Sequence, residues 1–301
     1  MAHRVYFGDN LDVLPTLPDR SVDLIYLDPP FNTGRVQRRT RLRTVQAADG
    51  DRLGFQGRRY TTIRLGSQAF ADRFDDYLRF LEPRLREAHR LLKPSGSLYV
   101  HLDYREVHYV KVLLDQLFGR AAFLNEIIWA YDYGGRPRDR WPAKHDTILF
   151  YAREPGRHVF DYDAIERVPY LAPGLVGPAK AARGKVPTDV WWQTIVPTNG
   201  RERTGYPTQK PLAVLRRIIQ ASSRPGDLVL DAFAGSGTTG VAAHALGRRF
   251  ILVDNNPQAL AVMARRLAHV PDVEWVGFDP RTAAPVPQPA GGRSWRAARV
   301  E

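Results

Sequence analysis

The chain contains no cysteine among its 301 residues. It therefore cannot form disulfides, hold a metal ion through thiolates or use a cysteine nucleophile, and a cytoplasmic chemistry without thiol redox is expected. It also has no run of about 18 apolar residues and no charged start followed by an apolar stretch. We therefore expect a soluble protein that is not exported.

Acidic residues are in the minority. The chain has 32 Asp and Glu against 44 Lys and Arg, which gives a formal net charge of +12. This excess favours a polyanionic partner, with nucleic acid as the first candidate. The length suits one α/β domain with insertions and is too short for two large domains.

Short apolar segments alternate with amphipathic segments along most of the chain, which predicts a largely parallel sheet with covering helices. Expected strands cover residues 4–7, 22–27, 97–102, 127–129, 147–151, 228–231, 250–254 and 273–278. One short helix is expected from residue 10. Further helices are expected over 70–92, 105–118, 211–222, the stretch from the glycine-rich turn to 246, and 257–268.

Three segments interrupt this pattern. Residues 35–64 contain nine arginines, two aspartates and little periodicity, so we expect a mobile basic loop over about 35–68. Residues 131–205 place aromatic and arginine side chains on irregular backbone, as in a surface insertion or a recognition module. Trp191-Trp192 in this segment is more typical of a core or dimer contact than of base stacking. Residues 281–301 have the composition of a disordered tail.

Residues 26–34 read YLDPPFNTG, which places an acid, two prolines and an aromatic ring where an apolar strand ends. Pro29 has no backbone N–H with which to continue a strand, so the strand should stop at Asp28. Because prolines fix φ, we expect Asp28, the Pro29 carbonyl and the Phe31 ring to be held nearly rigidly. An ordinary turn at a strand end is the alternative interpretation.

A glycine-rich stretch, DAFAGSGTTG over 231–240, lies between an expected strand and an expected helix. With Asp254 ending the next strand 19 residues after Gly235, it matches the dinucleotide-binding pattern, so an NAD enzyme must be considered. Two features oppose that interpretation. The pattern lies near the end of the chain, and Asp231 stands just before the turn, where its charge would repel a pyrophosphate.

A cofactor that carries positive charge would instead be attracted to Asp231. S-adenosylmethionine has an ammonium and a sulfonium, its ribose diol suits a carboxylate at Asp254, and the glycines let the backbone approach it closely. Upstream, the stretch from Pro207 to Pro211 precedes an expected helix. The free N–H groups of that helix start, with Lys210, could hold the methionine carboxylate.

Three stretches in a fixed order resemble one family. The chain carries LDPPF at 27–31, YPTQKPLAVLRRII at 206–219 and LVLDAFAGSGTTGVAA at 228–243. Together they resemble the DNA amino-methyltransferases that act on the exocyclic nitrogen of adenine or cytosine, in the order typical of the β class. Ala232, often proline in that family, and Phe31, often tyrosine, are departures that remove no polar group.

The resemblance covers about residues 3–278 and implies a three-layer, Rossmann-like methyltransferase fold of the α/β class in a circular arrangement. It divides the chain into a catalytic half (1–130), a target-recognition insertion (131–205), a cofactor-binding half (206–280) and the tail (281–301).

The resemblance also implies a mechanism. The lone pair of an exocyclic amine is delocalised into the ring, and Asp28 with the Pro29 carbonyl would accept its two hydrogens and draw the nitrogen toward a pyramidal geometry. Phe31 would stack on the base after the base leaves the duplex. The lack of cysteine excludes methylation at cytosine C5, which requires a thiolate nucleophile.

The expected site residues fall into three groups. The catalytic residues are Asp28, Pro29, Pro30 and Phe31. The cofactor-binding residues are Asp9, Asn10, Asp28, Thr208, Gln209, Lys210, Asp231, Phe233, Gly235, Ser236, Gly237, Thr238 and Asp254. The DNA-binding residues are Arg35, Arg38, Arg39, Arg41, Arg43, Arg136, Arg138, Arg140 and Lys144.

The target base is expected to be adenine, at N6, because the cytosine N4 enzymes of the family more often carry serine in place of Asp28. Cytosine N4 is the alternative target, and RNA is another possible substrate. A non-catalytic DNA-binding protein would leave Asp28 and Asp231 without a purpose. The resemblance further suggests double-stranded DNA in the nucleoid as partner, a homodimer and a cognate restriction endonuclease.

Overall fold

A computed structural model of the chain describes residues 2–46, 52–53, 59–72, 74–197 and 200–282. The chain divides into two compact units. The main unit contains residues 1–29 and 78–301, and the hairpin unit contains residues 30–77. The division into halves at 130 and 205 stays a prediction.

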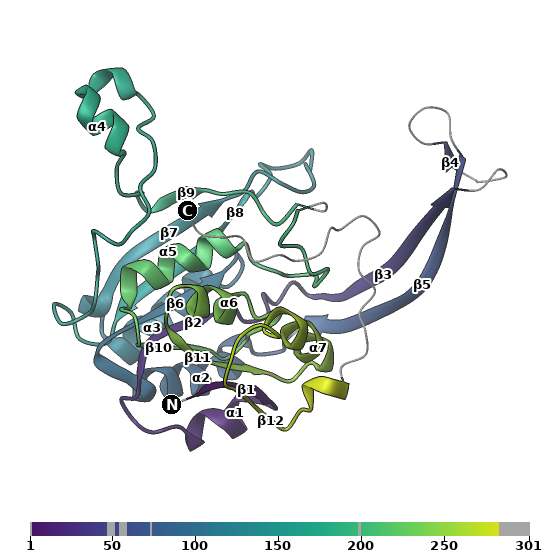
Figure 1. The fold of residues 1–301 in the computed structure, drawn as a ribbon, viewed down its shortest axis with the longest axis horizontal. Coiled ribbons are helices and arrows are strands. Elements are labelled where there is room, and N and C mark those ends of the chain that lie inside the picture. Colours follow the sequence, from purple (N-terminus) through teal and green to yellow (C-terminus); the bar gives the residue numbers. More distant parts are fainter. Residues whose placement is uncertain (1, 47–51, 54–58, 73, 198–199, 283–301) are drawn as a thin grey trace. The chain divides into compact units, whose positions relative to one another are not determined.

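The main unit is built on a nine-stranded sheet with the strand order β12-β1-β11-β10-β2-β6-β8-β7-β9 (Figure 1). The strands are β1 (His3–Phe7), β2 (Val22–Leu27), β6 (Leu92–Leu102), β7 (Phe123–Ala130), β8 (His145–Ala152), β9 (Val190–Trp192), β10 (Leu228–Asp231), β11 (Arg249–Asp254) and β12 (Val273–Val276). Neighbours are parallel except at β6 with β8 and β8 with β7. The sheet is therefore largely parallel, as expected, and mixed at one end.

Helices cover both faces of this sheet. The helices of the chain are α1 (Asn10–Val13), α2 (Tyr77–Leu91), α3 (Val107–Phe118), α4 (Pro178–Arg183), α5 (Leu212–Ser222), α6 (Thr238–Ala245) and α7 (Pro257–Arg266). On β8, Phe150 shares a buried cluster with Ile218 of α5, whereas the next residue, Tyr151, donates a hydrogen bond of 2.7 Å to Asp115 of α3. Because successive strand residues point to opposite faces, α5 and α3 lie on opposite sides, and the expected three-layer α/β fold is confirmed.

The hairpin unit is a three-stranded antiparallel sheet of order β3-β5-β4. Its strands are β3 (Arg35–Gln46), β4 (Arg52–Leu53) and β5 (Arg59–Asp72), and the β3–β5 register runs from Arg35 opposite Asp72 to Gln46 opposite Tyr60. The expected mobile loop was therefore wrong for these strands. Dense arginine hid the alternating, β-branched pattern of residues 41–45, which favours a strand.

Other segments also differ from the boundaries and content that the sequence predicted. The helix expected from residue 70 begins at Tyr77, because residues 70–72 belong to β5. The segment 131–205 contains β8, a strand inside the main sheet, as well as α4 and the short edge strand β9. Residues 283–301 of the expected tail lie outside the described residues. No helix in the described part of the chain is both long enough and apolar enough to cross a membrane.

Candidate active site

The carboxyl ends of three adjacent parallel strands bring acidic side chains to one edge of the sheet. Strand β2 ends one residue before Asp28, β10 ends at Asp231 and β11 ends at Asp254. Asp231 pairs with Tyr26 of β2 and with Leu252 of β11 in the backbone register. Ligands of open α/β sheets bind outside this edge, so it is the expected place for a reaction centre.

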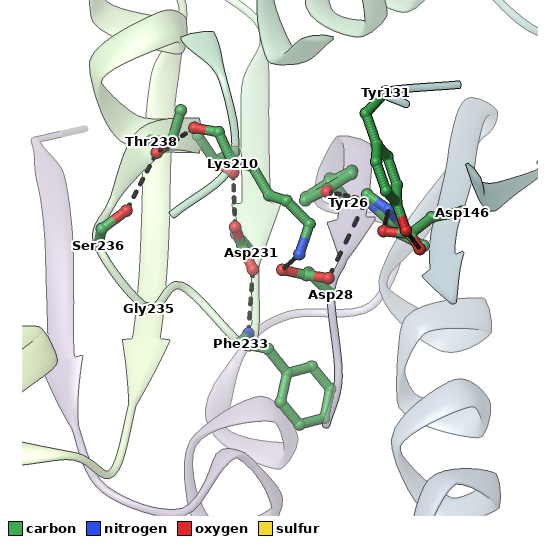
Figure 2. Close-up of polar contacts among 12 residues, drawn as sticks. Tyr26, Asp28, Tyr131, Asp146, Lys210, Asp231, Phe233, Gly235, Ser236 and Thr238 are labelled. Carbon is green, nitrogen blue, oxygen red and sulfur yellow. Dashed lines mark hydrogen bonds and ion pairs between the residues drawn. The ribbon is translucent and has the colours of Figure 1, made fainter. Parts of the chain in front are cut away.

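The two oxygens of Asp28 have different surroundings. Oδ2 accepts a hydrogen bond of 2.5 Å from the Lys210 ammonium, which reaches it from the start of α5 (Figure 2). Oδ1 is buried and has no hydrogen-bond partner in the described part of the chain, and it lies 4.0 Å from Nδ1 of His101. Oδ2 is therefore held by Lys210, and Oδ1 can still accept a hydrogen bond.

A buried polar network lies beside Asp28. His101 is fully buried, its Nδ1 lies 2.7 Å from the Tyr26 hydroxyl and its Nε2 lies 3.2 Å from Oδ2 of Asp146. The Tyr131 hydroxyl donates to the other oxygen of Asp146 at 3.2 Å. Burial raises the pKa of Asp146, but the hydrogen bond and charge of His101, the charge of Lys210 and the hydrogen bond of Tyr131 together more than offset it, and the net shift is downward.

Sequence analysis missed His101 and Asp146. The available signal was a histidine and an aspartate inside apolar stretches of β6 and β8, where an isolated polar residue needs a partner. Their partnership depends on the pairing of His101 with Ile148, which brings β6 and β8 side by side in antiparallel register.

The glycine-rich turn between β10 and α6 requires glycine at two positions. Gly235 and Gly237 have φ of 50° and 72°, in the left-handed region. A Cβ on Gly237 would lie 2.6 Å from Cγ of Met263, and one on Gly235 would lie 3.2 Å from Cε1 of Tyr206. The turn therefore keeps its backbone close to its neighbours.

Asp231, at the start of this turn, and Asp254, at the end of the neighbouring strand β11, are both anchored by hydrogen bonds. Asp231 accepts from the Phe233 N–H at 3.0 Å and from the Thr239 hydroxyl at 2.5 Å. Asp254 accepts from the N–H groups of Gly235 at 2.7 Å and Asn256 at 2.8 Å.

The protein environment disfavours negative charge on both carboxylates. Burial raises the pKa of Asp231 to about 7, and the charges of Asp28 and Asp254 add to this effect. Burial also raises the pKa of Asp254. A cationic ligand at this edge would relieve the penalty, so the acids fit a positively charged cofactor better than a pyrophosphate.

Three further predicted residues line this turn. Thr238 donates from its hydroxyl to the Lys210 carbonyl at 3.2 Å and lies 3.1 Å from the Ser236 hydroxyl (Figure 2). The Phe233 ring lies 6.3 Å from the Phe80 ring, measured between centroids. Arg266 donates to the Ser236 carbonyl at 2.9 Å, and burial lowers the pKa of this guanidinium to about 10.

Asp9 and Asn10 lie near the same turn, but their side chains already accept hydrogen bonds from Arg84. Asn10 donates to the Ala232 carbonyl at 2.9 Å and accepts from Arg84 Nε at 2.6 Å. Asp9 caps α1 through the Leu11 N–H and accepts from Arg84 at 3.1 Å. Arg84, which sequence analysis missed, thus joins α2 to these two residues.

The stretch before α5 is fixed by its own hydrogen bonds. Gln209 accepts from the Thr204 N–H at 2.8 Å and donates to the Glu202 carbonyl at 2.7 Å. Thr208 is exposed. The Lys210 ammonium contacts Asp28, a contact that the sequence did not predict, and the roles expected for these residues toward a cofactor stay predictions.

The expected DNA-binding residues lie in two places. Arg136, Arg138 and Arg140 are exposed on the loop between β7 and β8. On the same loop, the Lys144 ammonium donates to the carbonyls of residues 133, 134 and 135 at 3.1, 2.7 and 2.8 Å, so it holds the loop together. The backbone of Arg35, Arg38, Arg39, Arg41 and Arg43 forms β3, and their side chains lie outside what the structure describes.

The tryptophan pair is divided between core and surface. Trp191 is 7% exposed and belongs to the main buried cluster, as expected for a core residue, whereas Trp192 is 78% exposed. Arg217 of α5 places its guanidinium 4.9 Å from the Trp191 ring centroid.

Comparison with known proteins matches residues 22–265 to the model of a family described as DNA methylase. The chain is 33% identical over 280 residues to the type II methyltransferase M.HpaI of Haemophilus parainfluenzae, covering 93% of this chain and 77% of that protein. It is 32% identical over 279 residues to the DNA adenine methyltransferase YhdJ of Escherichia coli K12, covering 88% of this chain and 83% of that protein. The solved complex of M1.HpyAVI with S-adenosylmethionine shares the fold, with a TM-score of 0.56 and 22% identity over 88% of this chain and 98% of that one.

Proposed function

We propose that this chain, which belongs to the DNA methylase family, transfers a methyl group from S-adenosylmethionine to an exocyclic amino group in duplex DNA. Adenine N6 is the favoured target, as in the similar DNA adenine methyltransferase YhdJ. The observation that carries the proposal is Asp28, which has one oxygen held by Lys210 and the other buried without a partner among the described residues. Cytosine N4 is the second candidate, because the same acceptor pair serves either amine.

S-adenosylmethionine supplies an electrophilic methyl group on a sulfonium. Asp231 would bind the ammonium of this cofactor, because a cation compensates a buried carboxylate whose ionisation is costly. Asp254 has carboxylate lone pairs left beyond its two backbone hydrogen bonds, and these would accept from the ribose hydroxyls. The glycine turn leaves room for the close approach of backbone to ligand.

Asp28 and the Pro29 carbonyl would bind the target amine through its two hydrogens. This pairing localises the nitrogen lone pair and aims it at the methyl group. When the nitrogen–carbon bond forms and the carbon–sulfur bond breaks, the nitrogen must lose one proton. Oδ1 of Asp28, already hydrogen-bonded to that nitrogen, is the base placed to accept it.

DNA is the substrate of the family, and the exposed arginines of the β7–β8 loop suit its phosphates. Phe31 lies in the hairpin unit, and its stacking on a flipped base stays a prediction, as do the arginine contacts of β3. A homodimer, a location at the nucleoid and a cognate restriction endonuclease also remain proposals.

Expression in a methylation-deficient host, followed by modified-base sequencing of the genomic DNA, tests this function. We expect N6-methyladenine at one recurrent sequence, and no modification with an Asp28→Ala variant expressed at the same level. N4-methylcytosine would identify the second candidate. DNA without any modified base would contradict the proposal.

A further inference from the structure

The ion pair between Lys210 and Asp28 joins two segments that are 182 positions apart in the sequence. The side chains of both residues are largely buried, with exposed fractions of 11% for Lys210 and 14% for Asp28. The Lys210 backbone is fixed as well, because its carbonyl accepts from the Thr238 hydroxyl and the next residue is Pro211, at the N-cap position of α5, where the proline ring restricts φ. The ammonium is therefore presented to Asp28 from a rigid position.

A buried carboxylate with a single strong partner has a defined orientation. The ammonium occupies Oδ2, which leaves Oδ1 as the oxygen without a hydrogen-bond partner among the described residues. The orientation matters for an acceptor, because Oδ1 is the oxygen whose lone pairs can still accept a hydrogen bond from the target amine.

We propose that Lys210 is a positioning residue for Asp28: it holds Oδ2, so that Oδ1 is left to accept the hydrogen of the target amine. This role rests on the proposed function. It differs from the one that the sequence suggested for Lys210, in which the ammonium held the carboxylate of the cofactor.

Other charged or titratable groups also face Asp28, and a test must separate their effects from that of Lys210. They are His101, at 4.0 Å from Oδ1, and Tyr26, Tyr206 and Asp231, which interact with Asp28 electrostatically. Asp146 is coupled to both His101 and Lys210. None of these groups supplies a second permanent positive charge, so the removal of Lys210 leaves the carboxylate without its main compensating charge.

Lys210→Met tests the proposal, because it removes the charge and keeps most of the side-chain length. The kcat for methyl transfer should fall at least about tenfold, because Oδ2 loses its hydrogen bond and the carboxylate its fixed orientation, whereas the KM for DNA should change little. Lys210→Arg can still donate a hydrogen bond to Oδ2, so its kcat should lie closer to that of the wild type. The dissociation constant for S-adenosylmethionine is measured for each variant by calorimetry.

Lys93→Met is a matched control, because its partner lies on β2, the strand that also leads to Asp28. Lys93 donates to both oxygens of Asp23, at 2.8 and 2.9 Å, and belongs to no part of the proposed site. Its loss removes a comparable lysine–aspartate pair, so it reports any general effect of lost stability. We expect its kcat and its affinity for S-adenosylmethionine to equal those of the wild type.

A kcat of Lys210→Met equal to that of the wild type would overturn the inference, and a weakened affinity for S-adenosylmethionine would then assign Lys210 to the cofactor alone. A kcat that falls equally in Lys93→Met would overturn it too, because the loss would then reflect stability. A wild-type protein that transfers no methyl group would contradict the proposed function itself, and the inference would fall with it.

Discussion

Replacement of Asp231 by asparagine should stabilise the cofactor-free protein and weaken its binding of S-adenosylmethionine. Burial raises the pKa of this carboxyl from its ordinary 3.8 to about 7. A carboxyl whose pKa is higher in the folded state contributes stability below about pH 4, and this contribution is lost as the pH rises to about 7. At neutral pH the ionisation of this buried carboxyl therefore lowers the free energy of unfolding.

The size of the effect follows from the pKa shift. Each pKa unit corresponds to about 1.4 kcal/mol, so between pH 5 and pH 7 the free energy of unfolding should fall by about 2–3 kcal/mol because of Asp231 alone. The amide of the Asp231→Asn variant does not titrate in this range. The difference in unfolding free energy between Asp231→Asn and the wild type should therefore grow by about this amount over the same interval, measured by urea unfolding without cofactor.

Bound S-adenosylmethionine should reverse the preference of Asp231 for its protonated form. A bound ammonium favours ionised Asp231, so wild-type binding of S-adenosylmethionine near pH 6 should release up to about one proton, seen by calorimetry in buffers of different ionisation enthalpy. The variant should release fewer protons and bind more weakly. A stability difference that is the same at pH 5 and pH 7, together with unchanged proton release, would refute the assignment.

Three further variants, with one control, test the site and the proposed DNA contacts. Asp28→Ala should keep S-adenosylmethionine binding in calorimetry and lose methyl transfer, and an active variant would rule out the acceptor mechanism. Gly237→Ala should lower the unfolding free energy by at least about 1–2 kcal/mol, because a positive φ is costly with a Cβ, and Met263 must also move. Gly135→Ala, where a Cβ meets nothing within 4 Å, is its control and should change little. Neutralising three arginines of β3 should reduce the salt dependence of DNA binding by nearly one power of salt concentration each; an unaltered slope would exclude them as phosphate contacts. The three are Arg38, Arg39 and Arg41.

The sheet of the main unit could be predicted because its strands are short, apolar and bounded by local signals. Strand β2 ends before Asp28, and β10 ends at Asp231, as the sequence indicated. Both acids were predicted from the residues that follow them, Pro29 in one case and the glycines in the other. Their meeting at one edge then follows from parallel neighbouring strands.

The contacts between distant segments could not be predicted. The Lys210–Asp28 pair and the His101–Asp146 pair depend on the sheet order and register, which local patterns do not encode. The hairpin unit was missed for a different reason. Its strands are rich in arginine, and this charge obscured the alternating, β-branched pattern of residues 41–45; the backbone pairing of β3 with β5 then establishes them as strands.

The central claim is methyl transfer to an exocyclic amine with Asp28 as the acceptor. Purified protein is incubated with duplex DNA and S-adenosylmethionine carrying a labelled methyl group, and the DNA is digested to nucleosides. The account predicts label in N6-methyladenine with the wild type and none with Asp28→Ala. Label in a ring carbon such as cytosine C5, or equal labelling by the Asp28→Ala variant, would contradict it.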